Sequence, residues 1–152
     1  MSRPAEDPRT VLRRLYRDED GYELHGYELD EADEARVLAT HSSPTYGEIM
    51  PTATDRLVEH LRMRSDDVFY DLGSGVGKVV LQVAMRAPIK RCVGVELARG
   101  RHRIARRVLT EARALGLLRA RECELRCADF MRVPMGDATV VYTCSTAFPT
   151  AF

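Results

Sequence analysis

Beyond residue 67, two hydrophobic periods alternate along the chain. Four short segments have the apolar or alternating pattern of strands, namely 68–71, 92–96, 122–127 and 138–144. Between them, apolar side chains recur at helical spacing over 76–87 and again over 104–115. An alternation of strand and helix predicts parallel pairing with right-handed crossovers. We therefore expect an α/β fold with a parallel, doubly wound sheet.

Residues 1–43 have a more polar composition than the rest of the chain. Asp7 followed by Pro8 is typical of a helix start, and apolar residues follow at helical spacing. Residues 30–40 predict a second, acidic helix. We therefore divide the chain into a helical N-terminal segment, 1–43, and a domain that comprises residues 44–152.

Composition narrows the class of protein. The chain has 152 residues, 45% of them hydrophobic and 30% charged, which suits one folded domain and excludes collagen and wholesale disorder. No apolar run approaches the roughly 20 residues that cross a bilayer, so we expect no membrane partner. The four cysteines have no close paired spacing and the four histidines fit no metal-ligand spacing. We expect reduced core thiols, a cytoplasmic location and no bound metal.

Charge is unevenly distributed although the formal net charge is zero. Residues 1–40 hold six basic and eleven acidic side chains, whereas residues 86–126 hold twelve basic and four acidic ones. The basic segment predicts a surface for phosphate or for an acidic partner, nucleic acid included. An ordinary solvated helix face is an equal alternative, because 21 of the 23 basic residues are arginine.

A glycine-rich loop follows the first expected strand. Residues 71–78 read Asp-Leu-Gly-Ser-Gly-Val-Gly-Lys, and glycines at alternate positions let a ligand lie against bare backbone. A dinucleotide fingerprint would need glycine in place of Lys78, and a P-loop would need it in place of Leu72, so the spacing excludes both. The acid that opens the loop, Asp71, would repel a pyrophosphate. It suits a ligand that carries an ammonium and a sulfonium, such as S-adenosylmethionine.

Two further acids follow later strands of the expected sheet. Glu96 closes the second strand, 19 residues after Gly77, where its carboxylate can accept hydrogen bonds from a ribose diol. Asp129 and Phe130 follow the third strand, where an acid can accept from an adenine amino group and an aromatic ring can stack on the base. Together with the loop, they predict a nucleoside-binding site at the carboxyl ends of the strands.

Several motifs of the chain occur together in one known family. They are Thr-Tyr-Gly-Glu at 45–48, the stretch 66–84 with its Asp-Leu-Gly-Ser-Gly-Val-Gly core, Val-Gly-Val-Glu at 93–96, Ala-Asp-Phe at 128–130 and Ala-Phe at 147–148. Over about residues 44–148 the chain resembles the disruptor-of-telomeric-silencing family, the histone-lysine methyltransferases that lack a SET domain. The resemblance implies a Rossmann-like class I methyltransferase sheet, S-adenosylmethionine as cofactor, and a protein substrate with an accessible lysine.

The resemblance also implies a set of site residues. Tyr46 and Glu48 would lie on a loop over the methionine end of the cofactor. The implied cofactor-binding residues are Thr45, Tyr46, Glu48, Asp71, Gly73, Ser74, Gly75, Gly77, Glu96, Leu97, Asp129, Phe130 and Cys144. Where the family has Asn-Asn-Phe-Ala-Phe beside the lysine channel, this chain has Cys-Ser-Thr-Ala-Phe at 144–148. Tyr46 and Ser145 are therefore the candidate catalytic residues.

The sequence leaves other functions open. Loss of the two amides favours a methyltransferase of the same fold that acts on a small molecule or on nucleic acid. The chain also ends eight residues after Cys144, whereas such sheets usually carry three more strands. This length favours a truncated, non-catalytic remnant that binds the cofactor weakly, or a partner that covers the open edge of the fourth strand.

Overall fold

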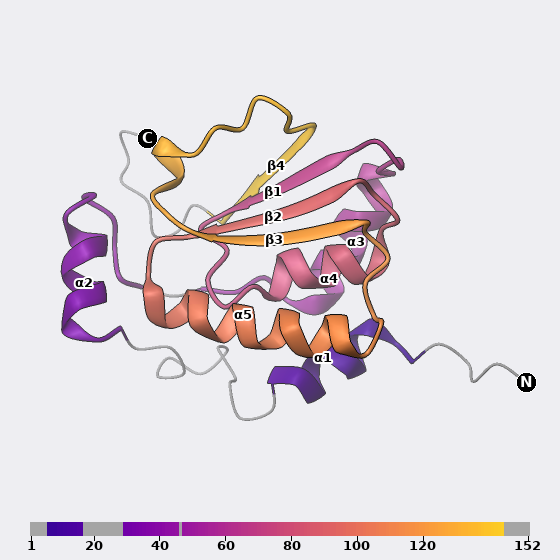
Figure 1. Cartoon of the computed structure of the whole chain (residues 1–152), viewed down its shortest axis with the longest axis horizontal. Coiled ribbons are helices and arrows are strands. Elements are labelled where there is room, and N and C mark those ends of the chain that lie inside the picture. Colours follow the sequence, from indigo (N-terminus) through magenta and orange to yellow (C-terminus); the bar gives the residue numbers. More distant parts are fainter. Residues whose placement is uncertain (1–5, 17–28, 46, 145–152) are drawn as a thin grey trace, which may run out of the picture.

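Four parallel strands in the order β3-β2-β1-β4 form the centre of the computed structural model (Figure 1), which describes residues 6–16, 29–45 and 47–144. The strands are β1 (Val68–Leu72), β2 (Arg91–Glu96), β3 (Glu122–Cys127) and β4 (Val140–Thr143). The parallel sheet confirms the expected fold class, and β4 is shorter than the predicted segment at both ends.

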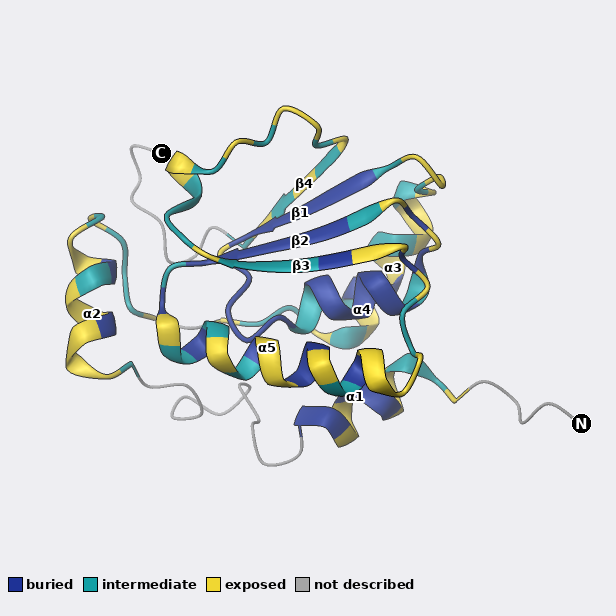
Figure 2. Cartoon of the chain, in the orientation of Figure 1, coloured by how far each residue is buried: buried dark blue, intermediate teal, exposed yellow. Residues whose placement is uncertain are grey.

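Burial explains why β1 and β2 have continuous apolar runs. All five residues of β1 are buried, and so are five of the six residues of β2, as Figure 2 shows. Strands that are covered on both faces have nearly continuous apolar runs, and the buried exceptions here are Asp71 and Glu96. In register, Leu72 pairs with Val95 on one side and with Thr143 on the other. The carboxyl ends of three strands therefore meet at one edge of the sheet.

Helices cover one face of this sheet. The helices α3 (Pro51–Leu61), α4 (Lys78–Arg86) and α5 (Arg99–Ala114) lie on the side seen below the sheet in Figure 1. The largest core cluster fills the space between them and the strands, with Leu81, Val83 and Val108 fully buried. Helices α4 and α5 confirm the two helical periods predicted over 76–87 and 104–115, although α5 begins earlier, at Arg99.

The other face is covered by the connection from β3 to β4. This segment contains a single 3₁₀ turn, η1 (Phe130–Arg132), rather than a long helix. Phe130, Val133 and Met135 pack on the second core cluster, which includes Tyr70 and Val93 of the sheet. The sheet is thus covered on both faces, although the second layer is mainly irregular chain.

The two predicted N-terminal helices are present as α1 (Pro8–Tyr16) and α2 (Glu31–Leu38). Their starts follow the expected chemistry, because Asp7 accepts a hydrogen bond from the backbone N of Arg9 at 3.2 Å and Asp30 accepts from that of Asp33 at 2.8 Å. Helix α1 buries four apolar side chains in the same core cluster as α4 and α5.

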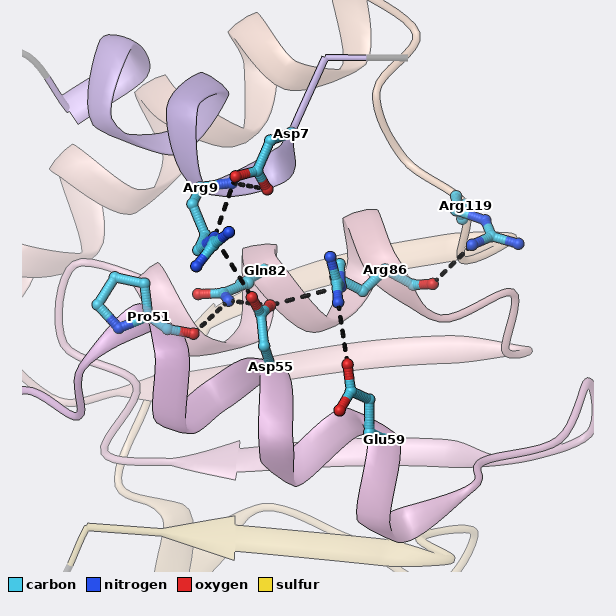
Figure 3. Close-up of polar contacts among 8 residues, drawn as sticks. All are labelled: Asp7, Arg9, Pro51, Asp55, Glu59, Gln82, Arg86 and Arg119. Carbon is cyan, nitrogen blue, oxygen red and sulfur yellow. Dashed lines mark hydrogen bonds and ion pairs between the residues drawn. The ribbon is translucent and has the colours of Figure 1, made fainter. Parts of the chain in front are cut away.

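A buried polar junction also fixes α1 to its neighbours (Figure 3). Asp55 of α3 accepts a hydrogen bond from Gln82 Nε2 of α4 at 2.6 Å, and Gln82 donates to the carbonyl of Pro51 at 2.8 Å. Arg9 Nε of α1 lies 3.5 Å from the same carboxylate, and Arg86 Nε lies 3.4 Å from it. One acid therefore joins three helices.

Two expectations from composition can be compared with the described residues. None of the helices in the described part of the chain has the length and apolar character that crossing a membrane requires. Cys92 and Cys123 are buried in the core, as expected, whereas Cys127 is exposed and Cys144 is half-buried. The expectation of a core position was wrong for Cys127 because β3 is an edge strand, which is only partly covered.

Candidate functional site at the carboxyl edge of the sheet

The glycine-rich loop folds back over the end of β2. The backbone N–H groups of Gly73 and Ser74 both donate to the carbonyl of Val95 at 2.9 Å. The N–H of Gly75 donates to Oε2 of Glu96 at 2.7 Å. The loop and the acid that closes the second strand, predicted separately from the sequence, are therefore in direct contact.

Two glycines permit this close packing. Gly77 has a φ of +87°, and a Cβ built there would lie 3.0 Å from Cβ of Ala105 in α5. Gly94 of β2 leaves room for the loop from the opposite direction, since its Cβ would lie 2.9 Å from Oγ of Ser74. A side chain at position 77 would push the loop away from α5, and one at position 94 would push it away from the sheet.

Two buried acids lie at this edge. Asp71 is 2% exposed, and its burial, together with the nearby charge of Glu96, raises its pKa to about 7. Burial also raises the pKa of Glu96, although backbone N–H donors and Arg101 oppose the shift. The two oxygens of Glu96 accept from the N–H groups of Gly75 and Ala98 at 2.7 and 2.8 Å. Carboxylate oxygens have further lone pairs, so these bonds orient Glu96 without exhausting its acceptor capacity.

The loop before α3 is held over the site by two cations. Lys78 Nζ lies 2.8 Å from Oε2 of Glu48, and both side chains are largely buried. Arg101 of α5 donates to the carbonyl of Pro44 at 2.7 Å. Glu48 was expected at the methionine end of a cofactor. Here its carboxylate forms an ion pair with the first residue of α4.

A pocket between these elements contains part of the predicted site. Its lining includes Glu48, Asp71, Gly73, Ser74, Gly75 and Cys144 from the predicted set. Gly77 and Glu96 are outside this lining, since Gly77 turns against α5 and Glu96 accepts from the N–H of Gly75. Thr45 is exposed and bonds to Ser43. Tyr46 and Ser145, the candidate catalytic residues, lie outside the described residues.

The other predicted residues lie beyond this pocket, near the ends of β2 and β3. Leu97 is half-buried after β2, and its carbonyl lies 3.9 Å from Sγ of Cys127. Asp129 begins η1 and accepts a hydrogen bond from the backbone N of Met131 at 2.9 Å. Phe130 packs against the second core cluster. A role for these three residues in base or ribose recognition stays a prediction.

Sequence reasoning missed five residues of the pocket, namely Gly47, Ile49, Lys78, Val79 and Tyr142. One signal was available for Lys78. A cation at the first position of a helix opposes the helix dipole, so a lysine there indicates a nearby acid. Tyr142 gave no such signal because it reads as an ordinary strand residue.

The residues present fit a nucleoside-bearing cation. Glycines without Cβ atoms form one wall, Gly73 is exposed, and the buried acid Asp71 lies beneath them. A positively charged ligand would stabilise the ionised form of this acid, which burial disfavours.

Comparisons with known families and sequences agree with one another. The sequence model of the family described as "Histone methylation protein DOT1" matches residues 29–133. The chain is 33% identical over 123 residues to a Drosophila melanogaster protein named "Histone-lysine N-methyltransferase, H3 lysine-79 specific", which covers 76% of this chain. A Caenorhabditis elegans protein of the same name is 39% identical over 67 residues, or 44% of this chain. The aligned part is only 7% of the length of each of these relatives.

Solved structures show the same fold. An RNA methyltransferase from Salinibacter ruber, in complex with S-adenosyl-L-homocysteine, is 30% identical with a TM-score of 0.55 over 64% of this chain and 60% of that protein. A methyltransferase from Geobacter sulfurreducens, in complex with the same compound, has a TM-score of 0.55 at 20% identity over 79% of this chain and 45% of that protein. The second similarity concerns the fold alone.

Proposed function

This chain belongs to the histone methylation protein DOT1 family, and from that membership we propose that it is an S-adenosylmethionine-dependent methyltransferase whose acceptor is a protein lysine. One observation carries the proposal more than any other. The glycine-rich loop is hydrogen-bonded directly to the acid at the end of β2, through Gly75 and Glu96. This pairing of bare backbone with an oriented carboxylate suits a nucleoside.

The described residues divide the binding of such a donor among them. Gly73 and Gly75 would contact it through backbone, Glu96 would accept from its ribose, and Asp71 would lie nearest to positive charge. When bound, S-adenosylmethionine supplies a methyl group made electrophilic by the attached sulfonium. The chain need not supply a covalent nucleophile, so positioning and the exclusion of water are its contributions.

The acceptor must reach the site as a neutral amine. An unperturbed lysine has a pKa near 10.4, and transfer out of water favours its uncharged form. Two segments that border the pocket would form such an environment, since Glu48 and Cys144 both line it. We propose Tyr46 and Ser145, which adjoin these two segments in the sequence, as the groups beside the amine.

The names of the relatives suggest which lysine to test first. Those from Drosophila melanogaster and Caenorhabditis elegans are named for lysine 79 of histone H3, and we propose a histone H3 lysine as the acceptor. A histone acceptor favours a nuclear location over the cytoplasmic one that the cysteine content suggested.

A second candidate acceptor is nucleic acid, and two observations favour it. The exposed side of α5, within the basic segment 86–126, carries four arginines, Arg99, Arg103, Arg106 and Arg113. The similar protein from Salinibacter ruber is an RNA methyltransferase. Cations along one helix face suit a phosphate backbone.

Calorimetric titration with S-adenosylmethionine tests the donor site. We expect the wild-type chain to bind and Gly75→Arg to lose binding, because the new side chain would occupy the pocket and Gly75 has a φ of +56°. Gly136→Arg is the matched control, since a Cβ at Gly136 meets nothing within 4 Å and this glycine precedes β4, away from the carboxyl ends. Near-normal affinity of Gly75→Arg contradicts our placement of the pocket. No wild-type binding at millimolar donor contradicts the proposed function and favours a non-catalytic remnant.

Transfer of a radiolabelled methyl group distinguishes the acceptors. Histone H3, free RNA and a pool of small metabolites are offered separately to the chain. Label on histone lysine supports the first proposal, whereas label confined to RNA supports the second. Label confined to small metabolites contradicts both and points to a small-molecule methyltransferase.

A further inference from the structure

The last residue of α1 reaches into the glycine-rich loop. Tyr16 is 3% exposed, and its hydroxyl donates to the carbonyl of Val76 at 2.8 Å, in a buried contact between residues 60 positions apart. Val76 lies between two loop glycines with positive φ, Gly75 and Gly77. A side chain from the N-terminal segment thus satisfies a backbone acceptor within the glycine-rich loop.

The ring of the same tyrosine contacts the cation of the site. Lys78 Nζ lies 5.2 Å from the centroid of the Tyr16 ring, within the range of a cation–π interaction. The same ammonium lies 2.8 Å from the carboxylate of Glu48. Lys78 therefore connects Tyr16 of α1 with Glu48 in the loop over the pocket.

Tyr16 also lies behind the tightest turn of the loop. A Cβ at Gly77 would lie 3.6 Å from the Tyr16 hydroxyl and 3.0 Å from Cβ of Ala105. Helices α1 and α5 therefore enclose the turn from two directions. Helix α1 is itself held at its other end, where Arg9 meets Asp55 of α3 (Figure 3).

We propose that Tyr16 is a positioning residue of the donor site, which sets the glycine-rich loop through its hydroxyl and the Glu48 loop through Lys78. The proposal rests on the proposed function, because it concerns the same pocket. It gives a role to α1, which lies outside the residues 29–133 that the family model matches.

The expected loss of donor affinity follows from the conformational entropy that a less ordered loop must give up on binding. Without the hydroxyl, the buried carbonyl of Val76 loses its donor, and the loop gains freedom that donor binding must then remove. One net hydrogen bond corresponds to about 1 kcal/mol, or about five-fold in a dissociation constant. Removal of the Tyr16 hydroxyl should therefore weaken donor binding without unfolding the chain.

The decisive variant is Tyr16→Phe, which removes the hydroxyl and keeps the ring beneath Lys78. We expect its dissociation constant for S-adenosylmethionine to rise about five-fold. Leu12→Ala is the control, because Leu12 is a buried residue of the same helix. It should lower the melting temperature and leave the donor affinity of the folded chain unchanged. If Leu12→Ala is unfolded at the assay temperature, the milder Leu12→Val replaces it.

Hydrogen–deuterium exchange without donor provides a readout that is independent of activity. We expect faster exchange of the backbone amides at 74–78 in Tyr16→Phe and unchanged exchange there in the control. The proposal is overturned if Tyr16→Phe changes neither exchange nor affinity, or if the control weakens affinity as much. A wild-type chain that binds no donor refutes the proposed function, and exchange at 74–78 still decides whether Tyr16 positions the loop.

Discussion

Among single residues, Asp71 has the most unusual environment. It belongs to a central strand and is 2% exposed, with a second acid, Glu96, close enough to influence its charge. Burial and that neighbouring charge both penalise ionisation and raise the pKa to about 7, so the protonated and ionised forms are about equally populated near neutral pH. The ligand-free chain therefore carries an acid that ionises more readily once a positive charge is bound beside it.

This environment predicts a pH-dependent stability. The pKa of Asp71 rises from an ordinary value of 3.8 to about 7 on folding, so the folded chain binds more protons between these values and loses stability as the pH rises through them. Asp71→Asn should remove this contribution. Between pH 4 and pH 8, the difference in unfolding free energy between variant and wild type should change by at most about 4 kcal/mol. Urea denaturation across this range, without donor, measures it.

An exposed acid serves as the control for that measurement. Asp66→Asn makes the same substitution at a site whose side chain is 78% exposed, so it shows the effect of the substitution without burial. Parallel pH profiles for Asp71→Asn and the wild type would show that burial does not perturb Asp71.

Residues of the site could be predicted where the signal is local. Asp71, Gly73 and Gly75 stand within one loop, and the end of a strand marks Glu96. Long-range partners could not be predicted in this way. The ion pair of Lys78 with Glu48 joins residues 30 positions apart, and the Tyr16 contact spans 60. No periodicity encodes such pairs, because they depend on how the elements pack.

At the scale of elements, the N-terminus of α5 is capped by an acid of α2. Its N-cap residue is Ala98, which has no polar side chain, and its first turn contains no acid. Asp33 of α2 accepts instead from the backbone N–H groups of Arg99 and Gly100, at 2.9 and 2.7 Å. Burial would raise the pKa of Asp33, but these two bonds and nearby arginines outweigh it, so the pKa is lowered.

Removal of this cap should destabilise the fold. We expect Asp33→Ala to lower the free energy of unfolding by about 1–3 kcal/mol, because two helix N–H donors and the helix dipole lose a charged partner. The contribution is present above the ordinary pKa of 3.8 and is lost as the pH falls through the lowered folded value.

Chemical denaturation at pH 7 and at pH 3 measures this effect. Glu34→Ala is the matched control, since Glu34 is an exposed acid of the same helix. Equal losses of stability in the two variants would show that Asp33 does not cap α5.

Elements were predicted well where packing imposes one period. Helix α5 buries one face and therefore has a clear helical period, whereas α4 is buried over six consecutive residues, 80–85, and β1 is buried throughout. The connection from β3 to β4 was not predictable. Its apolar residues, among them Val133 and Met135, cover the sheet from irregular chain and follow neither a helical nor a strand period.

At the scale of the whole molecule, the order of the sheet determines which strands lie at its edges. Within the described residues, β4 pairs on one side only, with β1. Its residues alternate between half-buried and exposed, and Val141 is 53% exposed. An edge strand that carries an exposed β-branched residue favours pairing with another chain.

We therefore expect the chain to self-associate through β4. Val141→Lys should weaken that association by at least roughly ten-fold, about 1.4 kcal/mol, because a charged side chain on an edge strand opposes pairing. Sedimentation velocity over a range of concentrations measures it. Met131→Lys is the control, since Met131 is 69% exposed and lies in η1. A wild-type chain that stays monomeric at the highest concentration would contradict the prediction.

The pairing of β1 with β4 also has a consequence for biosynthesis. The backbone of Val68 bonds to the side chain of Thr139, 71 residues later. At about 5–20 residues per second, a ribosome takes about 4–14 seconds to make that interval. Throughout this time one edge of β1 has no partner strand, because β4 has not yet been synthesised. Chaperones that shield apolar segments during translation would protect this strand until its partner arrives.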